Sequence, residues 1–241
     1  IIMEGNNDEV RGIWGSGQIV NNTINNQGES NSSYLPSNGS QSAAIWVENT
    51  YNGPTIVTGN ELTYSYLSYG IIVRDIEGVA EMVNNTLTGS SGRWAVYLYN
   101  SSVNFHDNVI DASDRGIRIQ STGAVISRNL IQTGGRAVEF TSQSGTQLNS
   151  NTIIGSGSAD YGVHISVNSG PDIFNNIIQG FQTGIHAESE VTNVSYNDFW
   201  NNDASFSGTG LPDLIGDLVT VNANGDDSDV YANIFLDPLF V

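Results

Sequence analysis

One repeated pattern restricts the fold of this chain more than any other feature of the sequence. An apolar residue, two variable residues, an asparagine, one variable residue and a second apolar residue recur eight times. The eight asparagines are Asn22, Asn60, Asn85, Asn108, Asn129, Asn151, Asn176 and Asn197. Successive copies lie 21 to 25 residues apart, except for one interval of 38. Such a period is typical of a solenoid, in which each repeat packs only against its neighbours.

The same period contains a second pattern, in which a small residue is followed by alternating apolar positions. The small residues are Ala44, Gly70, Ala95, Gly116, Ala137, Gly162 and Gly184, and Gly12 begins a shortened copy. Apolar residues at every second position are typical of a β-strand with one buried face, and helical spacing is not sustained. Strands stacked about 4.8 Å apart bury these positions as one column, and the recurring amides can then form a hydrogen-bonded ladder. The sequence therefore predicts an all-β fold of stacked coils.

Together the two patterns resemble the right-handed parallel β-helix superfamily, the pectate-lyase-like fold, over about residues 10–200. The resemblance implies a right-handed single-stranded parallel β-helix of about eight coils of 21–25 residues, with inward aliphatic stacks and an asparagine ladder. Lyases, hydrolases, epimerases, phage tailspikes and noncatalytic surface proteins share this architecture. The resemblance therefore implies a fold rather than a reaction.

Two stretches leave the repeat. We expect residues 1–202 to form the coils, with residues 25–42 as a protruding polar loop that accounts for the interval of 38. Residues 203–241 are expected to form an irregular C-terminal cap of the same domain, because an open end would expose the core. The segment 229–241 is similar to the end of many bacterial secreted β-helix domains. That similarity implies a secreted or cell-surface bacterial protein, with neighbouring domains in a longer chain.

Composition excludes several classes of protein. The chain has 25 acidic residues and seven basic ones, all arginine, for a net charge of −18, and it has no lysine or cysteine. Without cysteine there is no disulfide framework and no thiolate metal site. The negative charge argues against binding to nucleic acid or to an anionic membrane surface. No apolar run approaches the ~18 residues of a membrane span, so we expect no membrane insertion.

The strand register places one outward-facing row along the stack, with one residue per coil. This row is Trp14, Trp46, Ile72, Tyr97, Arg118, Glu139, His164 and His186, and its companion two residues later is Glu48, Arg74, Tyr99, Gln120, Thr141, Ser166 and Glu188. One interpretation is a carbohydrate groove, because flat rings stack on sugar faces while charged groups supply hydrogen bonds or acid and base groups. The sugar-contacting residues would then be Trp46, Tyr97, Tyr99 and His186.

Three members of this row are candidates for catalysis. Neighbours in the row lie about 5 Å apart, so Arg118, Glu139 and His164 could contact one substrate. The alternative is structural: aromatic residues suit exposed strand positions, and Arg118 and Glu139 form a cross-strand ion pair.

Arginine is concentrated in one part of the chain. Residues 93–136 contain five arginines and three aspartates, whereas the remainder contains two arginines and 22 acidic residues. Arg115 and Arg136 share one register, so either an anionic ligand or the nearby Asp111 and Asp114 must neutralise them. The internal pairing is the favoured alternative. An anionic ligand, if one binds, is expected here.

The C-terminal segment contains a candidate calcium loop. Residues 222–229 are rich in oxygen ligands, and Asp226, Asp227 and Asp229 are the candidate calcium ligands. The loop lacks the ligand order of an EF-hand, so a solvated acidic turn is the alternative. Calcium is the only cofactor that the sequence suggests, and none is required.

The groove rows lack the motifs of the superfamily's enzymes. They contain no aspartate to hold calcium as in pectate-type lyases, and neither a Gly-His-Gly nor an Arg-x-Lys motif of the hydrolases occurs. The favoured hypothesis is therefore a noncatalytic module, a rigid scaffold or adhesion surface that contacts polysaccharide or another cell-surface glycan. Two alternatives remain: a polysaccharide lyase or glycoside hydrolase with its site near Tyr97, Arg118, Glu139 and His164, and a phage tailspike-like part.

Overall fold

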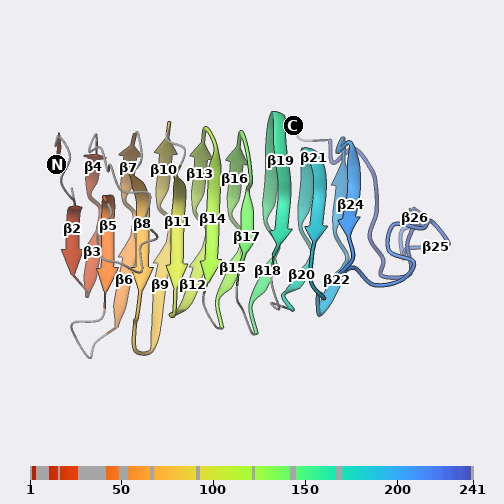
Figure 1. Ribbon diagram of the computed structural model, residues 1–241, viewed down its shortest axis with the longest axis horizontal. Coiled ribbons are helices and arrows are strands. Elements are labelled where there is room, and N and C mark those ends of the chain that lie inside the picture. Colours follow the sequence, from red (N-terminus) through yellow and green to blue (C-terminus); the bar gives the residue numbers. More distant parts are fainter. Residues whose placement is uncertain are drawn as a thin grey trace.

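The computed structural model describes residues 2–3, 11–15, 17–26, 42–48, 54–65, 68–90, 93–120, 123–141, 145–166 and 170–239. These residues form a β-solenoid whose strands follow one another along its long axis (Figure 1), and no helix occurs among them. The predicted class, an all-β parallel β-helix, is confirmed. Within this part of the chain, no helical segment is suited to crossing a membrane.

All described strands except β25 and β26 form three rows along the solenoid axis, and within a row each strand pairs in parallel with the equivalent strand of the next coil. The first row contains β2 (Arg11–Gly15), β5 (Ala43–Glu48), β8 (Tyr69–Arg74), β11 (Trp94–Tyr99), β14 (Arg115–Gln120), β17 (Val138–Phe140), the second halves of β19 (Thr152–Ile165) and β21 (Ile177–Ala187), and β24 (Ala204–Gly208). The second row contains β3 (Gln18–Val20), β6 (Thr55–Thr58), β9 (Val79–Val83), β12 (Ser102–His106), β15 (Val125–Ser127), β18 (Gln147–Asn149), β20 (Asp172–Phe174) and β22 (Asn193–Ser195).

The third row contains β1 (Ile2–Met3), β4 (Thr23–Asn26), β7 (Glu61–Tyr64), β10 (Thr86–Gly89), β13 (Val109–Ala112), β16 (Leu130–Thr133), the first halves of β19 and β21, and β23 (Asp198–Trp200). Because β19 and β21 continue from the third row into the first, these two rows form a single 16-stranded sheet.

The core lies inside the coils, where the alternating apolar residues stack in columns. One such column runs through Ile45, Ile71, Val96, Ile117, Val138, Val163 and Ile185, all of them fully buried. Where this small residue is glycine, as at Gly70, Gly116, Gly162 and Gly184, close packing against the next coil explains it. A Cβ added to Gly116 would lie 2.4 Å from the carbonyl oxygen of Ala137, which is closer than such atoms can approach.

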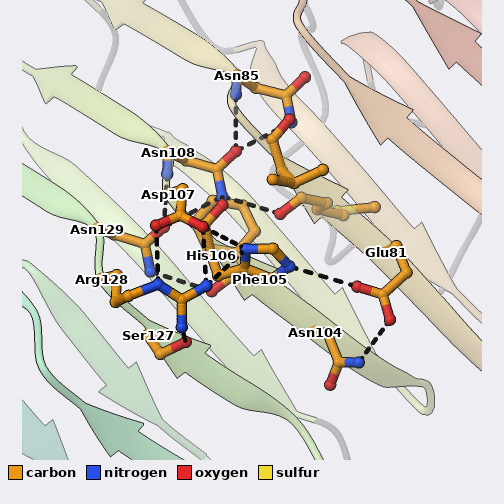
Figure 2. A network of polar contacts seen from close by, with 12 residues as sticks. Glu81, Asn85, Asn104, Phe105, His106, Asp107, Asn108, Ser127, Arg128 and Asn129 are labelled. Atoms are coloured by element: carbon orange, nitrogen blue, oxygen red, sulfur yellow. Dashed lines mark hydrogen bonds and ion pairs between the residues drawn. The ribbon is translucent and has the colours of Figure 1, made fainter.

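Asparagine side chains form a ladder at the turn between the second and third rows. The Oδ1 of each rung accepts hydrogen bonds from the backbone N–H and Nδ2 of the preceding rung; from Asn85 to Asn108 both are 2.9 Å (Figure 2). The residue before each rung has a positive φ, for example 56° at Asp107 and 54° at Arg128. The predicted ladder is confirmed, and it extends to a further rung, Asn233, whose Oδ1 accepts both bonds from Asn197.

The predicted polar loop and cap need two corrections. Asn25 and Asn26 belong to β4, Ser42 is buried beside β5, and residues 27–41 of the predicted loop lie outside the described residues. At the other end, β24 adds a strand to the first row beyond residue 202, so regular structure continues into the segment expected to be irregular.

Most of the segment beyond β24 lacks regular strands. It contains one short antiparallel pair, β25 (Thr220–Val221) with β26 (Asp227–Ser228), at the end of the solenoid farthest from the N-terminus (Figure 1). Phe206 and Phe235 pack around Phe199, with ring centroids 4.5 Å and 6.0 Å from it. The C-terminal segment thereby covers the apolar end of the stack.

Candidate functional site

The first-row strands place the predicted outward positions in one line. Register pairs Tyr97 with Arg118, Arg118 with Glu139, Glu139 with His164 and His164 with His186. The line continues to Ser207 on β24, which pairs with His186. Trp14 is in register with Trp46.

The aromatic end of this line is not an open sugar platform. Trp46 and Tyr97 are 0% exposed, so protein atoms cover their ring faces in this structure. They belong to a second apolar cluster, separate from the core, whose buried members are Ala43, Trp46, Tyr69, Ile72, Trp94 and Tyr97. Large side chains on neighbouring strands lie close enough to shield one another from water. Tyr99, with its ring centroid 6.1 Å from that of Tyr97, is only partly buried.

Beyond this cluster, the row and its neighbours form a connected polar site. We call it the polar centre and define it by Arg118, Arg136, Glu139, Tyr161, His164, His186 and Glu188. The structure thus brings together the three predicted catalytic residues with one predicted sugar contact, His186. Arg136 and Tyr161 enter from one side of the row, and Glu188 enters from the other side, just beyond the end of β21.

Glu139 is the buried anion of the polar centre, with 5% of its surface exposed. Its Oε1 accepts a 2.6 Å hydrogen bond from Arg136 and lies 3.2 Å from His164 Nδ1. Arg118 Nε lies 3.3 Å from Oε2, an ion-pair distance without the geometry of a hydrogen bond. Burial opposes the charged form, but the His164 contact and the two guanidinium groups outweigh it and lower the pKa of Glu139. The carboxylate is therefore ionised at neutral pH.

Three stacked rings flank this carboxylate. The ring centroids of Tyr161, His164 and His186 are 4.9–5.4 Å apart, with the planes inclined by less than 30°. The guanidinium of Arg136 lies 5.5 Å from the Tyr161 centroid, within cation–π range. His164 is 5% exposed, so its two ring nitrogens face protein groups rather than bulk water.

The two histidines present their Nε2 atoms to one carboxylate. Glu188 Oε1 lies 3.3 Å from His164 Nε2 and 3.8 Å from His186 Nε2. On its other side, His186 Nδ1 is 2.7 Å from Ser207 Oγ. Burial and the neighbouring His164 lower the pKa of His186. Among the described residues, these three side chains are the only group of histidines and carboxylates close enough to hold one metal ion.

Four arginines lie along the first row beside the polar centre. We call Arg93, Arg115, Arg118 and Arg136 the arginine band. Arg115 is 45% exposed and has a single long contact of 3.5 Å with Asp114, whereas Arg136 pairs with Glu139. Arg115 and Arg136, which share one register, are therefore each in contact with a carboxylate of the protein. The carboxylates in these contacts are Asp114 and Glu139, and the predicted partner Asp111 takes no part in them. The guanidiniums of Arg115 and Arg118 lie 5.7 Å and 5.9 Å from the ring centroids of Trp94 and Tyr97.

The fifth arginine of the sequence cluster, Arg128, belongs to a different surface. It donates two hydrogen bonds to the Asp107 carboxylate, at 2.9 Å and 2.8 Å, and His106 Nδ1 lies 2.6 Å from the same carboxylate (Figure 2). His106 Nε2 is also 3.5 Å from Glu81 Oε2. This second-row network was not among the predictions from the sequence. The sequence does contain a pattern that predicts the Asp107–Arg128 contact. Each of these residues directly precedes a ladder asparagine, so the two occupy equivalent positions on adjacent coils.

The candidate calcium residues occupy different environments. Asp229 is 0% exposed, and its carboxylate accepts four hydrogen bonds of 2.9 Å, from Gly216 N, Tyr231 N, and both the N–H and Nδ2 of Asn233. It therefore terminates the asparagine ladder, which is a different role from the predicted one. Asp226 accepts a hydrogen bond from Asn222 Nδ2, and Asp227 is exposed. These three side chains do not converge on one point in the described part of the chain.

A cleft lies next to the polar centre. It has a volume of about 420 Å³ and is lined by residues 188–191 and 209–213. Glu188 belongs to both the cleft and the polar centre, whereas the two stacked histidines are not part of the cleft lining.

Comparison with known proteins identifies the family. The sequence profile described as "right handed beta helix region" matches residues 69–235, more than half of the chain. The chain therefore belongs to the right-handed β-helix family. Searches of curated proteins and of solved structures found no significant match. The resemblance inferred from the repeats is confirmed as a fold, and no particular enzyme family is identified.

Proposed function

We propose that this protein is a noncatalytic β-helix module of a secreted or cell-surface bacterial protein, and that it binds an acidic polysaccharide along the first row. The arginine band is the observation that carries this proposal. Within the part of the chain that the structure describes, Asp114 contacts Arg115 and Glu139 contacts Arg118 and Arg136, so arginine is concentrated along this row of a chain whose net charge is −18. Planar guanidinium groups bind carboxylates and sulfates in a bidentate manner, so a local positive band favours an acidic glycan over a neutral one.

The state of Glu139 supports a binding role rather than glycoside hydrolysis. Hydrolysis requires two carboxyl groups beside the scissile bond, one of them protonated with a raised pKa. The pKa of Glu139 is lowered, and Arg136, His164 and Arg118 surround its oxygens. Glu139 is therefore suited to holding its neighbours in place, and it is a poor proton donor at neutral pH.

The test is affinity electrophoresis of the wild-type chain and two arginine variants through gels that contain acidic or neutral polysaccharides. We expect acidic glycans to retard the wild type, and Arg115→Ala to weaken that binding by about tenfold, the loss of one charge-assisted contact. Arg128→Ala is the matched control, because it removes the same charge from the second-row surface. Equal effects of the two variants, or equal retardation by neutral glycans, would contradict the proposal.

A polysaccharide lyase is the second candidate, and the contact between His164 and Glu139 favours it. A carboxylate that holds one ring nitrogen of histidine orients the other nitrogen as a base. In a lyase reaction that base would remove the proton α to a uronate carboxylate while the glycosidic C–O bond at the β carbon breaks, and the departing sugar oxygen would take up a proton from solvent. The adjacent arginines would neutralise the uronate carboxylate. Unsaturated product from a polyuronate, formed by the wild type and not by His164→Asn, would establish this activity in place of the noncatalytic role.

A further inference from the structure

We propose that His164, His186 and Glu188 form a binding site for one zinc ion, with Nε2 of each histidine and one carboxylate oxygen as ligands. This inference goes beyond the proposed glycan binding, which requires no metal. It rests on three observations: the convergence of the ligand atoms, the partners of the opposite ring nitrogens, and the exposure of the site on one side.

The fold itself produces the convergence. His164 and His186 occupy the same register on adjacent coils. Glu188 follows His186 by two residues, and side chains two residues apart lie on the same face of a strand. The three ligand atoms all lie within 4.8 Å of one another, with 3.3 Å and 3.8 Å between Glu188 Oε1 and the two Nε2 atoms. Ligand atoms of a tetrahedral zinc site, with bonds of about 2.0–2.2 Å, lie about 3.2–3.6 Å apart. Small side-chain rotations therefore suffice to close the site.

The opposite ring nitrogens have the partners that metal-bound histidines require. A metal-ligating histidine donates its other N–H to a carboxylate, a carbonyl or a similar acceptor, and this fixes the tautomer and the ring orientation. His164 Nδ1 lies 3.2 Å from the Glu139 carboxylate, and His186 Nδ1 lies 2.7 Å from Ser207 Oγ. The Glu139 carboxylate is placed where it can accept the His164 N–H. Glu139 and Ser207 are thus positioning residues, and the two Nε2 atoms on the opposite side of the rings are the ones nearest Glu188.

The ligand set indicates zinc rather than calcium. Two imidazoles and one carboxylate suit zinc and its first-row neighbours, whereas calcium prefers oxygen ligands alone. Three protein ligands leave one tetrahedral position for water or a ligand. The side chains of His164, His186 and Glu188 are 7%, 23% and 52% exposed, so the fourth position faces the solvent side of the row. Glu188 also lines the neighbouring cleft.

The competing arrangement has no metal. A protonated His164 would bridge Glu139 and Glu188 as an ion pair, with Arg136 in the same network at 3.4 Å from His164 Nδ1. That arrangement uses the same distances around His164. In it His186 Nε2 contacts Glu188 only at 3.8 Å and binds no ion, so the zinc affinity of His186 variants distinguishes the two arrangements.

The experiment is a titration of the full, untagged chain with zinc by isothermal calorimetry, followed by titration with cobalt(II), whose absorption spectrum reports the coordination. We expect one ion per chain with micromolar or tighter affinity and a tetrahedral cobalt spectrum from nitrogen and oxygen ligands. His186→Ala and Glu188→Gln remove ligands at exposed positions, and each should weaken binding at least about 100-fold. Ser207→Ala, which removes an outer partner, should weaken binding about tenfold, with recovery in Ser207→Thr.

His106→Ala is the matched control, because it removes the chain's remaining histidine from the second row and should leave affinity unchanged. Circular dichroism and thermal melting establish that each variant is folded. His164 is buried, so a substitution there could unfold the protein. The test therefore uses His186 and Glu188 instead. Absence of zinc binding to the folded wild type would overturn the proposal, and so would affinities in His186→Ala and Glu188→Gln equal to that of His106→Ala. Neither result would bear on glycan binding, which is measured without metal.

Discussion

At the scale of single residues, the position before each ladder asparagine has two roles. It adopts a left-handed backbone conformation at the turn, and its side chain projects to the surface beside the equivalent residue of the next coil. Asp107 and Arg128 occupy this position on adjacent coils, which is why they form the best-aligned exposed ion pair of the second row. Their contact follows from the repeat and needs no additional element.

Asp107 provides a prediction about pH. Hydrogen bonds from Arg128 and His106 lower the pKa of Asp107 to about 2. Since this folded-state pKa is below the unfolded value, the resulting stability is present above about pH 4 and is lost as the pH falls toward 2. We expect Asp107→Asn to lower the melting temperature slightly at neutral pH, because exposed pairs contribute little. Asparagine tolerates the positive φ at this position, so the backbone should be unaffected.

Urea unfolding of wild type and Asp107→Asn at pH 7, 4 and 2.5 measures the effect. The difference in unfolding free energy between the two proteins should shrink as the pH falls. A difference that stays constant across this range would show that the carboxylate charge contributes nothing.

At the scale of elements, the first row has two parts with different physical character. From β5 to β11 its outward face is an apolar cluster, and from β14 to β24 it is the polar centre. Arg118 lies at the boundary between the two parts, with its guanidinium over the Tyr97 ring and its Nε beside Glu139. The apolar part thus forms a rigid support for one side of the polar centre.

A substitution at Tyr97 tests whether this apolar part stabilises the fold or binds sugar. Its ring is fully buried, so Tyr97→Ala should destabilise the protein by about 3–5 kcal/mol, the usual cost of removing a buried aromatic side chain. Tyr99→Ala, at a partly exposed ring in the same strand, should cost much less. Chemical denaturation gives both values. If Tyr97→Ala kept the wild-type stability and lost glycan binding, the original prediction of a sugar-stacking role would be correct.

At the scale of the whole molecule, the stack has to end without exposing its core or its ladder. The C-terminal segment achieves both: Phe206 and Phe235 cover Phe199, and Ile234 forms a parallel bridge with Asp198 in the third row. The Asp229 carboxylate accepts the last donors of the ladder. One buried carboxyl side chain thus joins the end of the ladder to the surrounding cap.

Asp229→Ala should therefore destabilise the C-terminal end of the molecule. The substitution leaves four donors without their acceptor, and one unsatisfied buried group costs about 1–3 kcal/mol, so we expect a loss of at least about 2 kcal/mol. Hydrogen exchange should accelerate at Gly216, Tyr231 and Asn233 and remain slow in the central coils. Unchanged exchange at these amides would contradict the role of Asp229 as the end of the ladder.

Calcium provides the control for this residue. If Asp229 were a calcium ligand, added calcium would raise the melting temperature of the wild type and not that of Asp229→Asn. The hydrogen bonds of Asp229 predict no such difference.

Much of this structure follows from the sequence, because a solenoid repeats its local rules. The period alone assigns the outward row, and with it the adjacency of Arg118, Glu139, His164 and His186. The ladder's last rung was also accessible: Val230, Asn233 and Phe235 match the repeat pattern. It was missed because the segment after β24 separates Asn233 from Asn197 by 36 residues, outside the regular period.

Only the tertiary structure showed which side chains of the outward row are buried and which other side chains they contact. Whether an outward ring meets water depends on the bulk of its neighbours across the sheet, so Tyr69 and Trp94 decide the burial of Tyr97 although they belong to a different register position. Glu188 joins the two histidines because the chain turns just after β21, and Ser207 joins them because β24 adds a strand that the repeat did not predict. A periodic sequence determines which residues are neighbours along the axis. Only the packed molecule determines which of them are shielded from water and which atoms they contact.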